Sequence, residues 1–293
     1  MLKFNFMSLT PITKGWSGDK KYCVIRVDRR KYLLRISPSD HYNRKKVEFE
    51  MMQRVAALGV PMCQPIEFGT CDEGVYSLQR WIDGKDAEEK LPLLSDTEQY
   101  TYGLEAGRIL KKIHSLPISS TQEDWEIRFN CKIDRNIRIY SDCQIKYENA
   151  QTFIDYINSN RQLLKNRPQC YQHGDYHIGN MMIDNDGKLQ IIDFDRCDYG
   201  DPWEEFNRIV WSVQKAPLFA SGMVNGYFDN KVPLDFWRIL ILYISSNTLS
   251  SIPWALSFGQ KEIDTMINQA KDVLNWYDNM KNIVPTWYKS III

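Results

Sequence analysis

Three side chains between Cys170 and Pro202 have the types and the spacing for acid–base and metal chemistry. Asp175 lies five residues before Asn180, and Asp193 follows after a short hairpin pattern. A carboxylate such as that of Asp175 can accept the proton of an attacking hydroxyl group. The amide oxygen of Asn180 and the carboxylate of Asp193 are hard oxygen ligands of the kind that Mg²⁺ prefers. A divalent cation would also supply the positive charge that lets these acids lie close together.

The same stretch has the order of a kinase catalytic loop followed by a metal-binding segment. His173 precedes Asp175 by two residues, and Asp193-Phe194-Asp195 follows the hairpin. Phosphoryl transfer depends mainly on positioning and on neutralising charge, and these residues offer both. We expect His173 and His177 to support the loop, His173 through a side-chain to backbone hydrogen bond, because Asp175 already provides the base.

The elements that position this stretch begin with a region rich in strand patterns. Runs of β-branched and aromatic residues at 20–28 and 31–37 flank a charged turn, which predicts a hairpin. Two more short strands are expected before residue 84. Gly15 and Gly18 precede the hairpin, in a turn whose backbone amides could approach a phosphate. On the glycines alone, a flexible hairpin turn is the simpler interpretation.

A helix is predicted over residues 40–58 from an apolar stripe with helical spacing. The stripe consists of Val47, Met51, Val55 and Leu58. On a helical wheel, Glu48 borders the buried face and Glu50 points more toward water. A buried unpaired charge is costly, so an acid at this edge usually meets a cation. A boundary glutamate that is simply solvated is the more common alternative.

A capping box at Ser95 and Glu98 predicts a long helix that ends near His114. The remainder has mainly helical patterns, apart from a hairpin with an Asp-Gly turn over 181–195. The longest loops are expected at 83–95 and 117–125. The chain is thus expected to form a small β-rich lobe with one helix, a hinge near residue 80 and a larger helical lobe.

The composition is that of an ordinary soluble globular protein, with 43% apolar and 25% charged residues among 293. The 37 basic and 37 acidic residues give a net charge of zero, so the overall charge favours neither nucleic acid nor a membrane as partner. The seven cysteines form no CxxC pair, which favours a reducing compartment. The chain shows neither a signal-peptide pattern nor a run of about 18 apolar residues, and we expect it in the cytoplasm. The sequence does not predict an oligomeric state.

The residues resemble those of the aminoglycoside phosphotransferase and choline kinase-like family, which shares the protein-kinase fold. The segments HGDYHIGNMMID, LQIIDFD and GDPWEEF carry the resemblance, which extends over nearly the whole chain. It implies an α+β, bilobal, protein-kinase-like fold. Residues 1–82 would form a small antiparallel β lobe with one helix that binds nucleotide. Residues 83–293 would form a larger, mainly helical lobe that carries catalytic and substrate-binding residues.

The resemblance also implies ATP or GTP as phosphate donor and Mg²⁺ as cofactor. Asp175 would be the catalytic base, and Asn180 and Asp193 would be metal ligands. The glycine turn, a basic strand residue with its partner glutamate, and the hinge backbone would bind the nucleotide. These residues are Gly15, Gly18, Arg35, Glu48, Gln79, Arg80, Trp81 and Ile82.

Two positions depart from the family pattern. Most members have lysine at the position of Arg35, and an arginine is a wider, forked cation that should change the phosphate geometry. An exposed strand arginine is the alternative interpretation. Glu205 stands where the family has an aspartate tied to the catalytic loop, so the structural role of this longer side chain is open.

Acidic residues predominate around the candidate site, with nine acids against three basic residues between Tyr171 and Val210. The acids that the metal does not neutralise could attract a cationic substrate, and Asp195, Asp198 and Glu204 are our candidates for substrate binding. Asp195 could equally support the metal site or be a surface acid. Several tryptophans in the C-terminal part could cage a quaternary ammonium group, although core packing is the more common role.

The resemblance favours a kinase that phosphorylates a hydroxyl of a small, cationic substrate such as an aminoglycoside antibiotic, a reaction that confers resistance. A choline, amino-alcohol or sugar kinase is the alternative, and a nucleotide-binding pseudokinase or regulatory module is a second one. The presence of Asp175, Asn180 and Asp193 together favours an enzyme. A protein kinase ranks last, because no segment resembles an activation loop.

Overall fold

The chain divides into two compact units in the computed structural model, which describes residues 6–15, 18–118 and 122–289. The first unit consists of Met1–Lys90 and Asn180–Cys197, and the second of Leu91–Gly179 and Asp198–Ile293. A segment from the middle of the sequence therefore folds with the N-terminal part. The functional boundary that we place after residue 82 stays a prediction.

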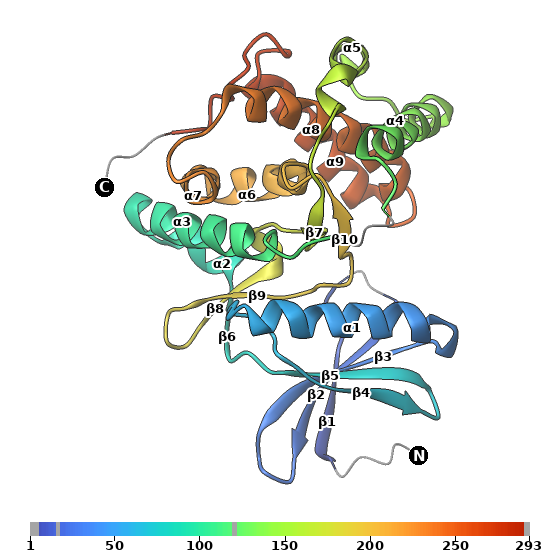
Figure 1. Ribbon diagram of the computed structural model, residues 1–293, viewed down its shortest axis with the longest axis vertical. Coiled ribbons are helices and arrows are strands. Elements are labelled where there is room, and N and C mark those ends of the chain that lie inside the picture. The colour runs from blue at the N-terminus through green and yellow to red at the C-terminus, as the bar shows by residue number, and fades with distance from the viewer. Residues whose placement is uncertain (1–5, 16–17, 119–121, 290–293) are drawn as a thin grey trace. The chain divides into compact units, whose positions relative to one another are not determined.

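An antiparallel sheet is the framework of the first unit (Figure 1). Its strands pair in the order β1-β2-β3-β5-β4. Their bounds are β1 (Phe6–Ile12), β2 (Lys20–Arg26), β3 (Lys31–Ser37), β4 (Pro65–Cys71) and β5 (Gly74–Arg80). The predicted hairpin is confirmed as β2 and β3, whose turn contains Arg29 at a left-handed φ of 62°. Alternate strand residues point to one face, where Val24, Leu34 and Leu78 are fully buried.

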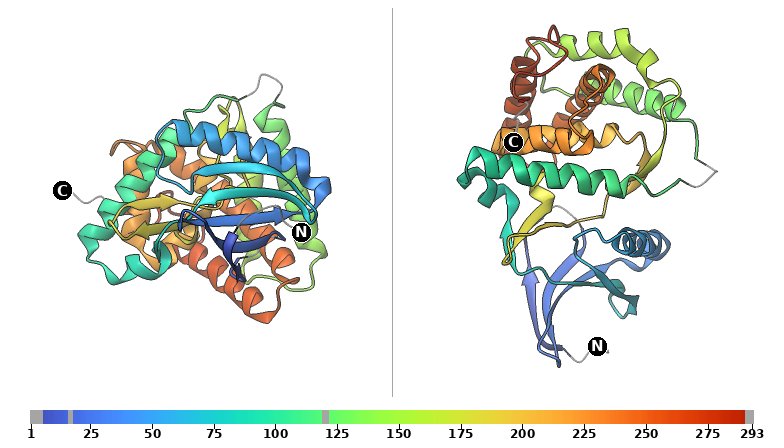
Figure 2. Two further views of the ribbon diagram at one scale, coloured as in Figure 1. Left: turned by 90° about the horizontal axis from the view of Figure 1, so that it is seen from below. Right: turned by 60° about the vertical axis from the view of Figure 1, so that its left-hand side comes forward.

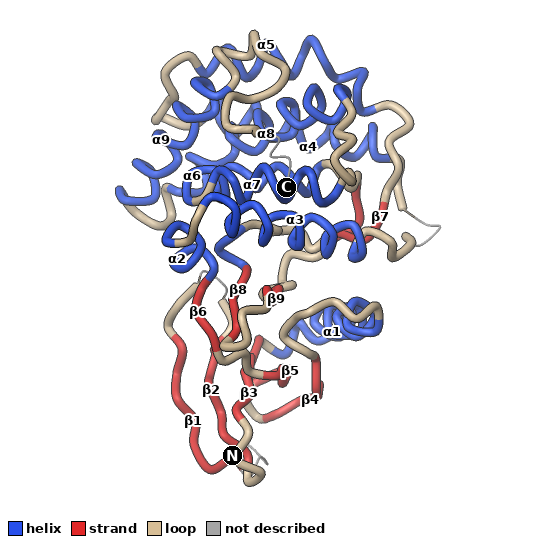
Figure 3. Tube along the Cα trace, turned by 90° about the vertical axis from the view of Figure 1, so that its left-hand side faces the viewer, coloured by secondary structure: helices blue, strands red, loops and turns tan. Residues whose placement is uncertain are grey.

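The helix α1 (Tyr42–Ala57) packs against β4 and β5 and follows the 3-10 turn η1 (Ser39–His41) (Figures 2 and 3). Phe49 anchors it to Phe68 of β4, with ring centroids 5.5 Å apart. The predicted stripe is wrong at Val47, which is 54% exposed. The helix buries Lys45 and Glu48 on the face of Phe49 instead, so its buried face includes charged residues that an apolar stripe does not reveal.

A second, three-stranded sheet completes the first unit. It pairs β6 (Gly84–Asp86), β8 (Met181–Asp184) and β9 (Leu189–Ile191), and α2 (Ala87–Lys90) follows β6. The hairpin predicted over 181–195 is confirmed as β8 and β9. The loop predicted over 83–95 is wrong, because β6, α2 and the 3-10 turn η2 (Leu91–Leu93) lie there. The partner strand of β6 is about a hundred residues away in sequence, so a local pattern could not show the pairing.

The second unit is mainly helical (Figure 1). Its α-helices are α3 (Asp96–Ile113), α4 (Trp125–Asp142), α5 (Ala150–Asn160), α6 (Ile209–Lys215), α7 (Pro217–Tyr227), α8 (Leu234–Ala255) and α9 (Gln260–Trp276). Two short strands, β7 (Cys170–Gln172) and β10 (Asp198–Gly200), form an antiparallel pair. The 3-10 turns are η3 (Arg161–Leu164), η4 (Ile178–Asn180) and η5 (Glu204–Arg208).

The helix α3 begins at the predicted capping box, which is confirmed: the Ser95 side chain accepts from the Glu98 N–H, and the Glu98 carboxylate accepts from the Ser95 N–H. It packs closely against α7 (Figure 2, right). Gly103 and Gly107 of α3 face α7, and a Cβ at Gly107 would lie 2.1 Å from the Met223 carbonyl oxygen. The helices therefore touch through their backbones, which only glycine permits at these positions.

Together the two units confirm the α+β class. Within the described residues, no helix is long and apolar enough to cross a membrane. All seven cysteines are free thiols.

Candidate active site

Arg35 lies at the centre of a buried ion-pair cluster in the first unit. Its side chain is only 6% exposed, which excludes the alternative of an exposed strand arginine. Its Nη1 lies 2.9 Å from Asp193 Oδ1, and its Nη2 lies 3.1 Å from Asp19 Oδ2 and also pairs with Asp195. Burial alone would lower the pKa of Arg35, but Asp193 and Asp19 raise it, so the guanidinium stays charged.

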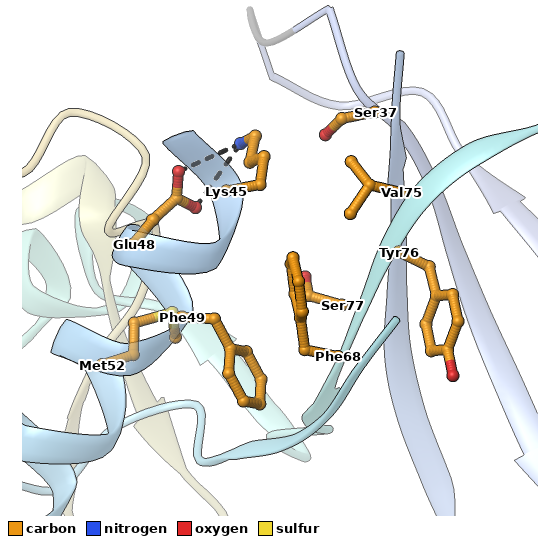
Figure 4. A pocket seen from close by; sticks show the side chains of 9 residues that line it. All are labelled: Ser37, Lys45, Glu48, Phe49, Met52, Phe68, Val75, Tyr76 and Ser77. Carbon is orange, nitrogen blue, oxygen red and sulfur yellow. Dashed lines mark hydrogen bonds and ion pairs between the residues drawn. The ribbon is translucent and has the colours of Figure 1, made fainter. Parts of the chain in front are cut away.

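Lys45 is a second cation in the cluster. Its Nζ lies 3.0 Å from Asp19 Oδ2, 3.2 Å from Glu48 Oε2 and 3.3 Å from Asp195 Oδ1. Figure 4 shows the Lys45 and Glu48 side chains pointing toward each other from one turn of α1. Glu48 is 7% exposed and has Lys45 as a cationic partner, so the alternative of a solvated boundary glutamate is wrong. Burial raises the pKa of Glu48, and the positive charges of Lys45 and Arg35 oppose this shift.

Asp19 joins the start of β2 to both cations. Its carboxylate accepts from the Ser37 hydroxyl at 2.6 Å and is bound by Arg35 and Lys45. Burial would raise the pKa of Asp19, but the Ser37 hydrogen bond and the two positive charges hold it below its usual value. The carboxylate therefore stays ionised and ties the end of the glycine turn to β3 and α1.

Asn180 and Asp193 both belong to the first unit, where the hairpin of β8 and β9 separates them. The Ile192 N–H donates to the Asn180 carbonyl at 3.1 Å, which closes the hairpin just before Asp193. Asp193 adopts a left-handed φ of 64°, uncommon outside glycine and frequent at functional sites. Its side chain remains 39% exposed although it pairs with Arg35. An amide oxygen and a part-exposed carboxylate are donors that fit Mg²⁺.

The glycine turn before β2 is only partly described, since residues 16–17 lie outside the described residues. Gly15 has a φ of +100°, which favours glycine. A Cβ there would also lie 2.5 Å from Lys21 Nζ. By contrast, a Cβ at Gly18 would meet nothing within 4 Å. Sterics thus explain Gly15 and leave Gly18 unexplained.

The hinge candidates follow the end of β5. Gln79 is 3% exposed, and its side chain contacts the Met52 sulfur at 3.8 Å. The Arg80 N–H donates to the Gln64 carbonyl at 2.8 Å and is therefore already used. Trp81 and Ile82 are part-exposed and follow the strand. The Arg80 N–H is therefore not available to a nucleotide base.

Asp175 belongs to the second unit, where the side chains of Arg208 and His177 approach it. Arg208 Nε lies 3.3 Å from Asp175 Oδ1, and His177 Nε2 lies 3.7 Å from the same oxygen. Among the described residues, the Arg208 Nε–H has no hydrogen-bond partner. Its contact with Asp175 is therefore an ion pair. The Asp175 N–H donates to His173 Nδ1 at 3.3 Å, which confirms the expected side-chain to backbone support by His173.

Glu205 holds the backbone on both sides of Asp175. Its carboxylate accepts from the Gly174 N–H at 2.9 Å and from the Tyr176 N–H at 3.4 Å. It is 2% exposed, and His114 Nε2 lies 3.6 Å from it. Burial would raise the pKa of Glu205, but His114 and the Gly174 N–H bring it below its usual value. The longer side chain therefore still ties down the catalytic loop.

The substrate-binding candidates lie in different surroundings. Asp195 is bound by Arg35 and Lys45 in the first unit, which favours a supporting role beside Asp193. Glu204 is 9% exposed, and Lys132 Nζ lies 2.9 Å from its Oε1. Asp198 is exposed, with Arg128 at 3.7 Å. Substrate binding by these acids stays a prediction.

Several tryptophans of the second unit pack against neighbouring side chains, whereas Trp254 is 37% exposed. Trp237 and Trp287 are buried, with ring centroids 6.0 Å apart. Trp203 stacks on the Arg167 guanidinium at 3.8 Å, and Arg167 pairs with the fully buried Asp201. These contacts favour core packing over an ammonium cage.

One small cavity lies beside the candidate residues, and a larger one lies apart from them. A cavity of about 10 Å³, with room for about one water molecule, is lined by Lys45, Glu48 and Ser37 (Figure 4). A larger cavity of about 700 Å³ in the second unit is lined by Gln99, Trp276 and others, but by none of the candidate residues.

Sequence reasoning missed three charged residues: Asp19, Lys45 and Arg208. The spacing of Lys45 and Glu48 on one helix, three residues apart, was a visible signal for an ion pair. The other two act through contacts between elements, which no local pattern reveals.

The sequence matches the phosphotransferase enzyme family (APH) over residues 8–237, which is most of the chain. No curated protein matches it. Among solved structures, it is similar to a choline/ethanolamine kinase family protein from Mesorhizobium loti, with 15% identity and a TM-score of 0.67. That match covers 94% of this chain and 91% of the other.

Two aminoglycoside phosphotransferases are similar to the same degree. One is a thermostable mutant of APH(4)-Ia in a ternary complex with ADP and hygromycin B, at 15% identity, TM-score 0.65, and 92% and 94% coverage. The other is the GDP complex of aminoglycoside 2'-phosphotransferase-IIIa, at 14% identity, TM-score 0.66, and 92% and 93% coverage. These likenesses show the protein-kinase-like fold. The chain belongs to the phosphotransferase enzyme family (APH).

Proposed function

We propose that the protein is a small-molecule kinase that transfers the γ-phosphate of ATP or GTP to a hydroxyl group. One observation supports this most: the buried Arg35 guanidinium lies 2.9 Å from Asp193, whose side chain is still 39% exposed. A strand cation joined to an acid that remains open to ligands suits a centre that binds phosphate and metal. A purely structural ion pair would not require the acid to stay exposed.

Asp175 would accept the proton of the acceptor hydroxyl. Glu205 holds the peptide groups on both sides of it, and Arg208 attracts its carboxylate. These contacts orient Asp175, which is what a general base requires. His173 limits the movement of the same loop from within the core, where it is fully buried.

Asn180 and Asp193 would hold Mg²⁺, which when bound neutralises charge on the phosphate groups. The nucleotide would be held by the turn at Gly15 and Gly18, beside the charged cluster that contains Arg35 and Glu48, and by the hinge. The hinge consists of Gln79, Arg80, Trp81 and Ile82. Structures of the same fold include a complex with ADP and a complex with GDP, which supports both adenine and guanine nucleotides. We therefore propose ATP or GTP.

For the acceptor we propose a cationic compound such as an aminoglycoside, bound by acids that include Asp195, Asp198 and Glu204. The hygromycin B complex of a relative supports this class. The likeness to a choline/ethanolamine kinase family protein supports an amino alcohol as the alternative acceptor, and a sugar is another. In the aminoglycoside case the protein would confer antibiotic resistance. The free cysteines support a reducing, cytoplasmic location.

The test is nucleotide consumption with ATP and with GTP against aminoglycosides, macrolides, choline-like amines and sugars, in Mg²⁺. We expect one class of acceptor to stimulate turnover in the wild type and not in D175N. A protein that binds nucleotide but consumes none with any acceptor would instead be a pseudokinase. The presence of Asp175, Asn180 and Asp193 favours the enzyme.

A further inference from the structure

The Arg35 side chain has little capacity left for phosphate groups. A guanidinium has five N–H donors. Nε donates to Asp19 at 3.3 Å, Nη1 donates to Asp193 at 2.9 Å, and Nη2 pairs with Asp19 and Asp195. Only 6% of the side chain is exposed. Arg35 therefore organises the surrounding acids, and another cation is needed to contact a polyphosphate.

Lys21 occupies the appropriate position on the next strand. It is paired with Arg35 in the register of β2 and β3, so both side chains leave the same face of the sheet. Its Nζ donates to the Lys14 carbonyl at 2.6 Å and lies 2.5 Å from the position that a Cβ at Gly15 would take. The ammonium group thus reaches the glycine turn from the face that carries Arg35.

The charge of Lys21 is not neutralised by a direct carboxylate partner. Within the described part of the chain it forms no ion pair, in contrast to Arg35 and Lys45. Burial and the nearby Arg35 lower the pKa of Lys21, against the pull of Asp193 and Asp19. An anion beside Lys21 would relieve this repulsion between cations and complete the coordination of its ammonium group.

We propose that Lys21 is a phosphate-binding residue for the nucleotide, and that it performs the contact for which most of the family has a lysine at the Arg35 position. This inference rests on the proposed function. A lysine is a compact point charge on a flexible stem, whereas the fork of Arg35 is fixed by three acids. Arg35 on β3 thus holds the acids, and Lys21 on β2 binds phosphate.

The test compares K21M with K20M by calorimetric titration of ATP, ADP and adenosine in Mg²⁺, and of the guanine set if the wild type prefers GTP. Lys20 is the matched control, because it is 61% exposed and pairs with Glu73 at 2.7 Å. We expect K21M to weaken ATP and ADP binding about 10- to 100-fold and to leave adenosine unchanged, as for a lost charge-assisted contact. K20M should stay within about twofold of the wild type, and K21R should recover part of the loss.

Two results would overturn the inference. K21M and K21R could both bind ATP as the wild type does, or K21M could lose ATP and adenosine affinity equally, which would place the effect in the fold or in base binding. If the melting temperature is lowered in K21M but not in K21R, the substitution by Met has disturbed the fold. The ATP affinity of K21R then replaces that of K21M in the comparison. A wild-type protein that binds neither ATP nor GTP would overturn the proposed function itself.

Discussion

Replacing Lys45 by Met tests whether the cluster around Arg35 is a buried, mutually dependent charge network. The substitution keeps an apolar stem of similar length and removes only the ammonium group. Three carboxylates lie within 3.3 Å of that group, and the side chains of Lys45, Asp19, Glu48 and Asp195 are all 14% exposed or less. Breaking a buried ion pair by removing one partner costs about 3–5 kcal/mol. Arg35 still neutralises Asp19 and Asp195, so we expect a loss near the lower limit, about 3 kcal/mol.

Urea unfolding at pH 7 measures the effect, with K46M as control. Lys46 is the next residue of α1, half-exposed, and lies 3.9 Å from Glu50, which is also half-exposed. K46M should therefore change the free energy of unfolding by less than about 0.5 kcal/mol. The double variant K45M/E48Q should be more stable than K45M, because it no longer buries an unpaired glutamate.

The pH dependence of K45M has a definite sign. Burial already raises the pKa of Glu48, and loss of Lys45 raises it further. An acid with a raised pKa in the folded state binds more protons folded than unfolded, so stability falls as pH rises above its unfolded value. K45M should therefore be closer to the wild type at pH 5 than at pH 7. Equal stability of K45M and K46M at pH 7 would refute the buried network.

Three further predictions concern the second unit. E205Q should lower the free energy of unfolding at pH 7 by about 1.5–3 kcal/mol, since a charged acceptor for the Gly174 N–H is lost. Because the folded-state pKa of Glu205 is lowered, the difference from the wild type should shrink as pH falls below the usual value of 4.5. R208A should reduce kcat by about tenfold or more with nucleotide affinity retained, since the Asp175 carboxylate loses its ion pair. G107V should lower the melting temperature by several degrees or prevent folding, because its Cβ would collide with the α7 backbone.

Each of these has a control and a contradicting result. R238A is the control for R208A, because the Arg238 side chain is 43% exposed and pairs with Asp235 on its own helix. Equal kcat in R208A and the wild type would remove the role of Arg208. G18A is the control for G107V, since a Cβ there meets nothing within 4 Å. A pH-independent difference between E205Q and the wild type, measured from pH 7 to pH 3.5, would show that the carboxylate charge is irrelevant.

Local patterns predicted those elements whose cause is local. The hairpin of β2 and β3, the hairpin of β8 and β9, and the Ser95 capping box each depend on residues close in sequence. The same reasoning failed for β6, whose partner is β8, and for Val47, because α1 buries charged residues. These features depend on contacts between distant segments.

For the candidate site, the sequence supplied the residue types and the structure supplied their partners. The family pattern predicts a cation at Arg35 and an acid at Glu48, and both side chains are buried. The helix wheel anticipated a cation for Glu48 but did not identify Lys45. The role of Glu205 could not be predicted, because reaching the Gly174 N–H depends on how η5 is placed. No local pattern carries that information.

The most direct test of the central claim compares D175N with the wild type for nucleotide affinity and turnover of the acceptor found in the panel. We predict unchanged affinity for the Mg²⁺-bound nucleotide and a loss of kcat of about 10²–10⁴-fold, because the variant cannot accept the hydroxyl proton. Turnover by D175N equal to that of the wild type would contradict the assignment of Asp175 as the base and, with it, the proposed phosphoryl transfer.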